Sequence, residues 1–217
     1  MDISEIKSNL REFYNREAET RNAADKKAWK LEVRDDFLSL IKAEGKAALL
    51  ELGAGAGHDS RFFMDNGLAV TAVDLSPEMV AKCKEKGVEA YELDYYNLSS
   101  LGRKFDCIWA MNSLLHVPKA DLSGVLDEIN SVLNDGGLLY IGVYGGDDWE
   151  REDVMHEDLD VPRYYASYSL DSLVCALGNH FMIVSSRQLD PGLDFKKSFG
   201  HYAFHSVVVQ KNKERSR

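Results

Sequence analysis

Two patterns of apolar residues divide the chain near residue 45. Before that point, apolar residues recur at spacings of three and four, which is the period of an amphipathic helix. The first run contains Ile3, Ile6, Leu10 and Phe13, and a second run covers residues 29–41 without any proline. We therefore predict an N-terminal helical segment over residues 1–44, which would form a lid.

From Lys46 onward, apolar runs alternate with helical patterns. Continuous runs such as Ala47–Leu52 are typical of strands that are buried on both faces of a parallel sheet. Repeated strand–helix units predict a doubly wound α/β sheet with helices on both faces. We expect a single domain over residues 1–217, with its α/β core at 45–210. The predicted strands are 47–52, 68–74, 88–93, 105–111, 138–144, 181–189 and 202–210.

The pattern is interrupted at residues 147–166, a possible insertion on the substrate side. Residues 147–160 hold eight acids and one base, Arg151. This segment is either a solvated loop or part of a site for a cationic or neutral small molecule, because aromatic faces attract cations. The aromatic residues that flank it are Tyr144, Trp149, Tyr164, Tyr165 and Tyr168.

The composition narrows the classes of partner. The net charge of −10 makes nucleic acid an unlikely partner and argues against binding to anionic membranes. No run approaches the roughly 20 apolar residues that span a bilayer. The charged N-terminal pattern differs from a secretory signal, and the three separated cysteines suit reduced thiols, so we expect a cytoplasmic protein, monomeric or homodimeric.

A glycine-rich turn follows the first strand. Gly53, Gly55 and Gly57 allow a sharp turn and a close approach of backbone N–H groups to a ligand. Asp74 ends the second strand, and a carboxylate there can accept both hydroxyls of a ribose. In such a sheet, ligands bind beyond the carboxyl ends of the strands.

This combination suits two classes of ligand. Nicotinamide enzymes space their glycines as G-x-G-x-x-G, but here the third glycine would fall at His58. Glu51 precedes the loop, where it would repel a pyrophosphate but suit an ammonium group. The residues therefore favour a ligand that carries an ammonium group, and a nicotinamide oxidoreductase remains the alternative.

The motifs resemble those of the class I S-adenosylmethionine-dependent methyltransferases. The likeness begins at Glu51-Leu52-Gly53-Ala54-Gly55-Ala56-Gly57 and spans about residues 46–145. It continues through Val73–Met79, Glu92-Leu93-Asp94, Phe105–Ile108, Leu115-His116-Val117 and Leu133–Gly137. The resemblance implies a Rossmann-like, seven-stranded, mostly parallel sheet whose last strand is antiparallel, and S-adenosylmethionine as the methyl donor.

The resemblance also assigns roles to residues around the cofactor. It places the Gly53, Ala54, Gly55 and Gly57 loop under the methionine part, with Glu51 at the amino end. Further cofactor contacts are implied for Asp74 at the ribose, Leu75, Asp94 and Tyr95 at the adenine, Ala110, Met111 and Asn112 at the sulfonium, and Tyr14 in a covering helix.

His116 follows the fourth predicted strand and is the candidate catalytic base. A histidine base would give a rate that rises between about pH 5.5 and 7.5. The histidines show no metal-ligand spacing, so no metal is expected. The leading hypothesis is a methyltransferase that acts on a small molecule. The alternatives are a protein or tRNA methyltransferase and a non-catalytic S-adenosylmethionine-binding protein.

Overall fold

A computed structural model describes residues 2–153, 161–190 and 203–213. Within these ranges, seven strands form one sheet in the order β3-β2-β1-β4-β5-β9-β8. All neighbours are parallel except β9, which runs antiparallel to both β5 and β8. The strands are β1 (Ala48–Leu52), β2 (Ala69–Asp74), β3 (Glu89–Glu92), β4 (Phe105–Met111), β5 (Leu133–Gly145), β8 (Met182–Leu189) and β9 (Ala203–Gln210).

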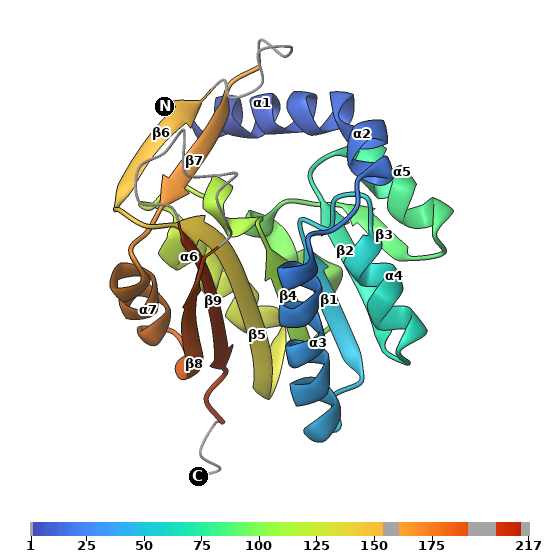
Figure 1. The fold of residues 1–217 in the computed structure, drawn as a ribbon, viewed down its shortest axis with the longest axis vertical. Helices are drawn as coiled ribbons and strands as arrows, with labels where there is room; N and C mark the ends of the chain where they lie inside the picture. The colour runs from blue at the N-terminus through green and yellow to red at the C-terminus, as the bar shows by residue number, and fades with distance from the viewer. Residues whose placement is uncertain (1, 154–160, 191–202, 214–217) are drawn as a thin grey trace.

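Helices cover both faces of the sheet (Figure 1). One face packs against α3, α4 and α5, and the other packs against α6, α7 and the 3-10 helix η1. This arrangement confirms the predicted Rossmann-like, doubly wound fold with seven strands and N-terminal helices. The helices are α1 (Ile3–Arg16), α2 (Ala18–Ala23), α3 (Ala28–Ala43), α4 (His58–Asp65), α5 (Pro77–Glu85), α6 (Leu122–Val132) and α7 (Leu170–Gly178), with 3-10 turns η1 (Tyr95–Leu101) and η2 (Leu114–His116).

Aromatic packing anchors α3 and α4 to the centre of the sheet. Trp109 on β4 and Tyr140 on β5 stack with ring centroids 4.0 Å apart, and both are buried. Phe37 of α3 and Phe63 of α4 complete the cluster. The third N-terminal helix is therefore part of the layer that covers the sheet, whereas α1 lies elsewhere.

Helix α1 crosses above the carboxyl ends of the parallel strands (Figure 1). Its apolar stripe buries Ile6, Leu10 and Phe13, as the spacing predicted. Asp2 caps the helix by accepting a hydrogen bond from the backbone N–H of Ser4. We call α1 together with α2 the roof.

A hairpin that the apolar pattern did not predict lies beside the roof. Strands β6 (Trp149–Asp153) and β7 (Arg163–Ser167) pair antiparallel, outside the main sheet. The described part of the acidic segment is thus partly a strand rather than a loop, while its residues 154–160 lie outside the described residues. Because β6 is rich in charge and joins no large sheet, it lacks the alternation that marks a strand.

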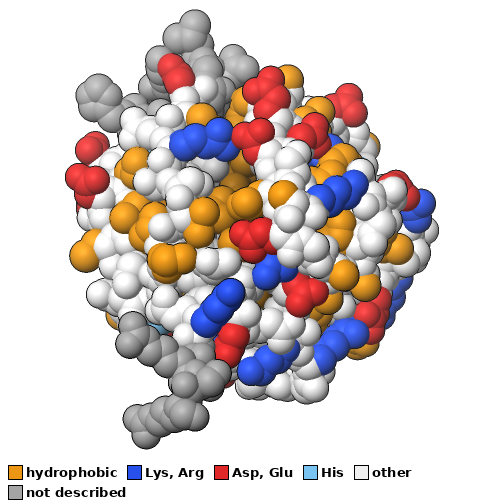
Figure 2. Space-filling view, turned by 90° about the horizontal axis from the view of Figure 1, so that it is seen from below, with side chains coloured by type: hydrophobic (Ala, Val, Ile, Leu, Met, Phe, Trp, Pro, Cys, Tyr) orange, Lys and Arg blue, Asp and Glu red, His pale blue; other side chains and the backbone are white. Residues whose placement is uncertain are grey.

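In the described residues, no helix is both long and apolar enough to cross a membrane. Figure 2 shows the face opposite the roof, where acidic and basic side chains are mixed rather than gathered into one basic field.

Candidate functional site

The cavity opens where the strand order reverses. Strands β1 and β4 are neighbours, but β2 and β5 lie on opposite sides of them. A cavity of about 490 Å³ lies at the carboxyl ends of these strands, between the sheet, the roof and the hairpin. This is the position at which an open α/β sheet binds its ligands.

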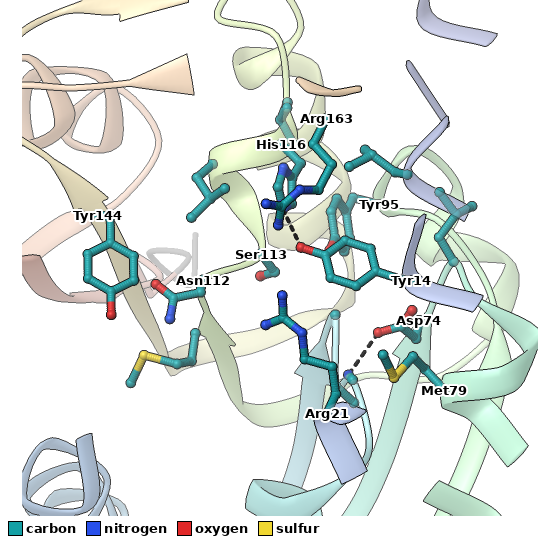
Figure 3. Close-up of a pocket in the computed structure, with 18 of the residues that line it drawn as sticks. Tyr14, Arg21, Asp74, Met79, Tyr95, Asn112, Ser113, His116, Tyr144 and Arg163 are labelled. Carbon is teal, nitrogen blue, oxygen red and sulfur yellow. Dashed lines mark hydrogen bonds between the residues drawn. The ribbon is translucent and has the colours of Figure 1, made fainter. Parts of the chain in front are cut away.

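The glycine loop and the acid that ends β2 are joined directly. The Gly55 N–H donates to Asp74 Oδ2 at 2.8 Å (Figure 3). The Ser76 N–H donates to Asp74 Oδ1 at 2.9 Å. Burial raises the pKa of Asp74, and these two hydrogen bonds partly offset that effect. A carboxylate offers about four acceptor positions, so Asp74 retains capacity for a ribose.

Glu51 is almost fully buried beneath the loop. Burial and the neighbouring charge of Asp59 raise the pKa of Glu51 well above its ordinary value. Its carboxyl also accepts a hydrogen bond from the Ser60 hydroxyl. The pKa of Asp59 is shifted in the opposite direction. Burial alone would raise it, but the charges of Lys26 and Arg34 lower it below its ordinary value. An incoming ammonium group would complement Glu51.

Leu75, Asp94 and Tyr95, which follow β2 and β3, also line the cavity. The Tyr95 side chain extends toward the glycine loop, where its hydroxyl would lie 2.5 Å from a Cβ atom added at Gly53. Asp94 Oδ1 accepts the Tyr96 N–H at 2.9 Å, and Oδ2 accepts Lys7 Nζ from the roof at 2.8 Å. The predicted adenine-binding acid is therefore already paired with a lysine. The sequence analysis missed Lys7, although it lies in the same helical stripe as Leu10.

The residues that leave β4 divide between two faces. Met111 and Asn112 line the cavity, but Ala110 does not, because its side chain is fully buried in the core. Side chains alternate along a strand, which turns the Ala110 side chain toward the α6 face, and its placement at the sulfonium stays a prediction. Asn112 has a left-handed φ of 55°, which asparagine tolerates better than most residues.

Gly57 also has a different place from the one expected. Gly53, Ala54 and Gly55 line the cavity, whereas Gly57 lies against α5. A Cβ atom added at Gly57 would lie 2.8 Å from Cys83 Sγ. Gly57 thus serves the packing of α4 on α5, and its assignment as a cofactor contact stays a prediction.

His116 joins the roof to the hairpin. Its Nδ1 lies 2.7 Å from the Tyr164 carbonyl oxygen, and its Nε2 lies 2.7 Å from the Tyr14 hydroxyl (Figure 3). A carbonyl only accepts, so Nδ1 carries the proton, and Nε2 accepts from Tyr14. Burial, together with a smaller effect of the charge of Arg163, lowers the pKa of His116 to about 3, although the hydrogen bond to the Tyr164 carbonyl acts in the opposite direction.

This arrangement leads us to expect a different pH profile. An imidazole with a pKa of about 3 is neutral throughout the range from pH 5.5 to 7.5. Its one lone pair is also occupied by Tyr14. We therefore expect no rate limb from His116 near neutrality.

Two acids of the described part of the acidic segment bind partners other than a ligand in the cavity. Asp148 binds Lys119 and the hydroxyls of Ser169 and Ser172, and Glu150 accepts from the Tyr164 hydroxyl. The hairpin instead lines the cavity with Trp149, Arg163, Tyr165, Ala166 and Ser167. This arrangement argues against acid-based recognition of a cationic acceptor. The sequence analysis also missed Arg163, because a lone arginine after a proline has no local pattern to mark it.

Several buried polar atoms of the lining have no hydrogen-bond partner among the described residues. They include His58 Nε2, beside the glycine loop, and Asn112 Oδ1, at the end of β4. Buried polar groups are normally hydrogen-bonded, so unpaired ones in a cavity fit a polar ligand. They lie at the part of the site where the resemblance places the methionine group, and the residues present therefore fit the cofactor.

A glycine loop and a strand-end acid at the switch point of a doubly wound sheet define a nucleoside-binding α/β protein. A family model described as a methyltransferase domain matches residues 49–137, the segment that builds this site.

Curated relatives agree with this match. The chain is 28% identical over 159 residues to a malonyl-[acyl-carrier protein] O-methyltransferase of Enterobacter lignolyticus, covering 69% of this chain and 61% of the relative. It is 32% identical over 116 residues to a ubiquinone biosynthesis O-methyltransferase of Xylella fastidiosa, covering 50% and 46%. The chain thus spans about half to three fifths of the length of these relatives.

Solved structures share the fold over nearly the whole chain. A 1,6-didemethyltoxoflavin-N1-methyltransferase of Burkholderia thailandensis, with bound S-adenosylhomocysteine, superposes with a TM-score of 0.73 at 22% identity, covering 98% of this chain and 92% of that one. The magnesium protoporphyrin IX methyltransferase of Synechocystis gives 0.68 at 16% identity, covering 98% of both. The resemblance to class I S-adenosylmethionine-dependent methyltransferases is therefore confirmed, with S-adenosylmethionine as the matching cofactor.

Proposed function

We propose that this chain transfers the methyl group of S-adenosylmethionine to a small-molecule acceptor. One observation carries the proposal. The same cavity is lined by Asp74, the glycine loop, Asn112 and the Tyr14–His116 pair. S-adenosylmethionine supplies a methyl group on a positively charged sulfur. The chain needs to align the acceptor and exclude water.

The size and enclosure of the cavity favour a small acceptor over a protein or tRNA. Small-molecule sites occupy roughly 300–1,000 Å³, and this cavity of about 490 Å³ lies in that range. The roof and the hairpin lie beyond the carboxyl ends of the parallel strands (Figure 1), and residues of both line the cavity. The two relatives named above are both O-methyltransferases, which favours oxygen as the atom that is methylated.

We assign the cofactor contacts by place in the cavity. Glu51 would hold the ammonium group, and Gly53–Gly55 would lie under the methionine part. Asp74 would hold the ribose, and Leu75, Asp94 and Tyr95 would surround the adenine. His116 is assigned as a positioning residue that fixes Tyr14, rather than as a base that titrates near neutrality.

We also propose that the roof acts as the lid. Tyr14 reaches His116, and Lys7 reaches Asp94, so the roof contacts both ends of the cavity. Cofactor exchange requires these two contacts to open. Helix α3 stays with the sheet because its buried face packs against Trp109 and Tyr140.

Calorimetry with S-adenosylhomocysteine on the full chain tests the proposed donor site. We expect one molecule to bind per chain, with no binding of NADH in parallel spectral titrations. Transfer of labelled methyl from S-adenosylmethionine to acceptors of low molecular weight then tests turnover. Folded protein that gives no heat with either S-adenosylmethionine or its demethylated product contradicts the proposal.

A further inference from the structure

Arg163 is a buried cation that the proposed transfer chemistry does not use. It lies on β7 with only 5% of its surface exposed, and its side chain points into the cavity beside His116 and Tyr14 (Figure 3). Across the described ranges, neither a carboxylate nor another hydrogen-bond acceptor lies within bonding distance of its guanidinium. Ion pairs and hydrogen bonds are present for several other arginines, including Arg34, Arg103 and Arg187.

The surroundings of Arg163 leave one recognition surface free. Its guanidinium carbon lies 4.0 Å from the ring centroid of Phe13 and 5.1 Å from that of Tyr165. Aromatic rings interact with the flat faces of a guanidinium and satisfy none of its N–H donors. The donors lie in the plane of the group, in a fork that matches the two oxygens of a carboxylate.

A buried arginine keeps its charge, and an unpaired buried charge is strongly unfavourable. Resting on the methyltransferase function proposed above, we propose that the acceptor carries a carboxylate-type anionic group that binds the guanidinium of Arg163. The substrate class is therefore a small organic acid, held at the hairpin end of the cavity.

Two acids at the hairpin already have partners of their own. Asp148 is paired with Lys119, and the Glu150 carboxylate accepts from the Tyr164 hydroxyl. Asp153 is the register partner of Arg163 on β6, so its effect on the charge at this end of the cavity is part of the test.

The carboxylate of the cofactor itself has other cations available. In methionine, the carboxylate and the ammonium group share one carbon, so both must lie near Glu51. Lys26 pairs with Asp59, the carboxylate that interacts with Glu51, and Lys30 lies close enough to interact with both Lys26 and Asp59. Arg163 belongs to the opposite side, where its neighbours are Phe13, His116 and Tyr165.

The test uses matched pairs of probes on protein saturated with S-adenosylhomocysteine. Benzoate and benzamide, and 4-hydroxybenzoate and 4-hydroxybenzamide, have nearly the same shape but differ in charge. We expect each acid to bind at least tenfold more tightly than its amide in calorimetry, and Arg163→Gln to remove that preference. Arg187→Gln, an exposed arginine paired with Asp36, is the control for a change of net charge and keeps the preference.

Several results would overturn the inference. Equal binding of acids and amides, including no binding by either, contradicts it. So does an acid preference that persists in Arg163→Gln. Asp153 is the register partner of Arg163 across the hairpin. A preference for acids over amides that emerges only in Asp153→Asn would identify Asp153 as the counterion of Arg163 and contradict the inference.

S-adenosylhomocysteine affinity separates this inference from the proposed function. We expect Arg163→Gln to change that affinity less than threefold. A tenfold loss would show that Arg163 holds the carboxylate of the cofactor and would overturn the inference alone. Failure of the wild-type chain to bind S-adenosylhomocysteine would instead contradict the proposed function.

Discussion

The Tyr14 hydroxyl donates to His116 Nε2 at 2.7 Å, across 102 residues of chain. This hydrogen bond joins the roof to the segment that follows β4. The other ring nitrogen is bound to the Tyr164 carbonyl of the hairpin. One neutral imidazole thus holds together the two elements that close the cavity.

Removal of the Tyr14 hydroxyl should weaken that junction. Tyr14→Phe leaves Nε2 without its donor, so we expect a loss of about 0.5–1.5 kcal/mol in S-adenosylhomocysteine binding. The pKa of His116 should rise, because the lost donor favoured the neutral ring. Calorimetry measures the first effect and nitrogen NMR the second. Tyr91→Phe, which removes an exposed hydroxyl bound to Glu89, is the control.

A double-mutant cycle with His116→Gln isolates the pair. Coupling energies of residues in contact are typically about 0.5–3 kcal/mol. Strictly additive losses would mean that Tyr14 and His116 act separately on the cofactor.

The charge state of His116 can be observed directly. Its folded pKa is about 3, against about 6.5 in an unfolded chain. We expect its NMR signals to report a neutral ring protonated at Nδ1 from pH 5 to 8, while the same residue in urea titrates near pH 6.5. The unfolded state binds the additional proton, so this group stabilises the fold above about pH 6.5. That contribution declines as the pH falls from 6.5 toward 3.

Activity should follow the same logic. With saturating substrates, His116 contributes no rise in rate between pH 5.5 and 7.5. A limb in that range that disappears in His116→Gln would contradict the neutral assignment.

Asp74→Ala should weaken S-adenosylhomocysteine binding by about 1.5–3 kcal/mol, the range for hydrogen bonds to a charged group. Part of this loss arises because the Gly55 N–H also loses its acceptor and the loop is less ordered. Calorimetry gives the affinity, and thermal unfolding shows whether the variant is folded. Asp36→Ala removes an exposed carboxylate as a control. Equal affinities for the two variants would place the ribose elsewhere.

Two glycines of the loop should respond in opposite ways to alanine. Gly57→Ala places a Cβ atom 2.8 Å from Cys83 Sγ and 3.1 Å from Cys83 Cα, in addition to a left-handed φ of 77°. We expect about 2–4 kcal/mol of destabilisation from overpacking and backbone strain together. Its effect on cofactor affinity should be small in protein that remains folded.

Gly55→Ala has no heavy atom within 4 Å of the new Cβ, so only the strain of its φ of 55° remains, about 1–2 kcal/mol. The methyl group would instead occupy the ligand side of the loop and reduce S-adenosylhomocysteine affinity. Unfolding midpoints and calorimetry on both variants provide the comparison. A larger loss of affinity in Gly57→Ala than in Gly55→Ala would restore Gly57 as a cofactor contact.

Cofactor binding should also release protons. The pKa of Glu51 lies above its ordinary value because of burial and Asp59, and an ammonium group beside it would lower that pKa. We expect proton release at pH 7 and an affinity that increases with pH up to the raised pKa. Calorimetry in buffers of different ionisation enthalpy measures this release. Glu51→Gln should abolish it, and the same release in that variant would assign the proton to another group.

The sequence was sufficient for the sheet because its strands are buried on both faces. Runs such as Phe105–Met111 have exact counterparts in the structure. The hairpin was missed because β6 pairs with β7 alone among the described strands and carries charge at most of its positions.

The site was predictable only where its residues lie at the ends of predicted strands. The glycine loop and Asp74 lie at strand ends that the apolar pattern defines. In contrast, the tautomer of His116 depends on a carbonyl 48 residues away and a hydroxyl 102 residues away. Arg163 derives its importance from burial and from the absence of a described counterion, neither of which is visible in a local pattern.

The hairpin holds the tautomer of His116 through a main-chain carbonyl, which any residue at position 164 supplies. The proton on Nδ1 therefore does not depend on which side chains the hairpin turns toward the cavity. For engineering, the segment between Tyr144 and Ser169, which contains β6 and β7, can be replaced as one unit. A hairpin of different sequence grafted there would redirect the enzyme to new acceptors while its affinity for the methyl donor stays the same.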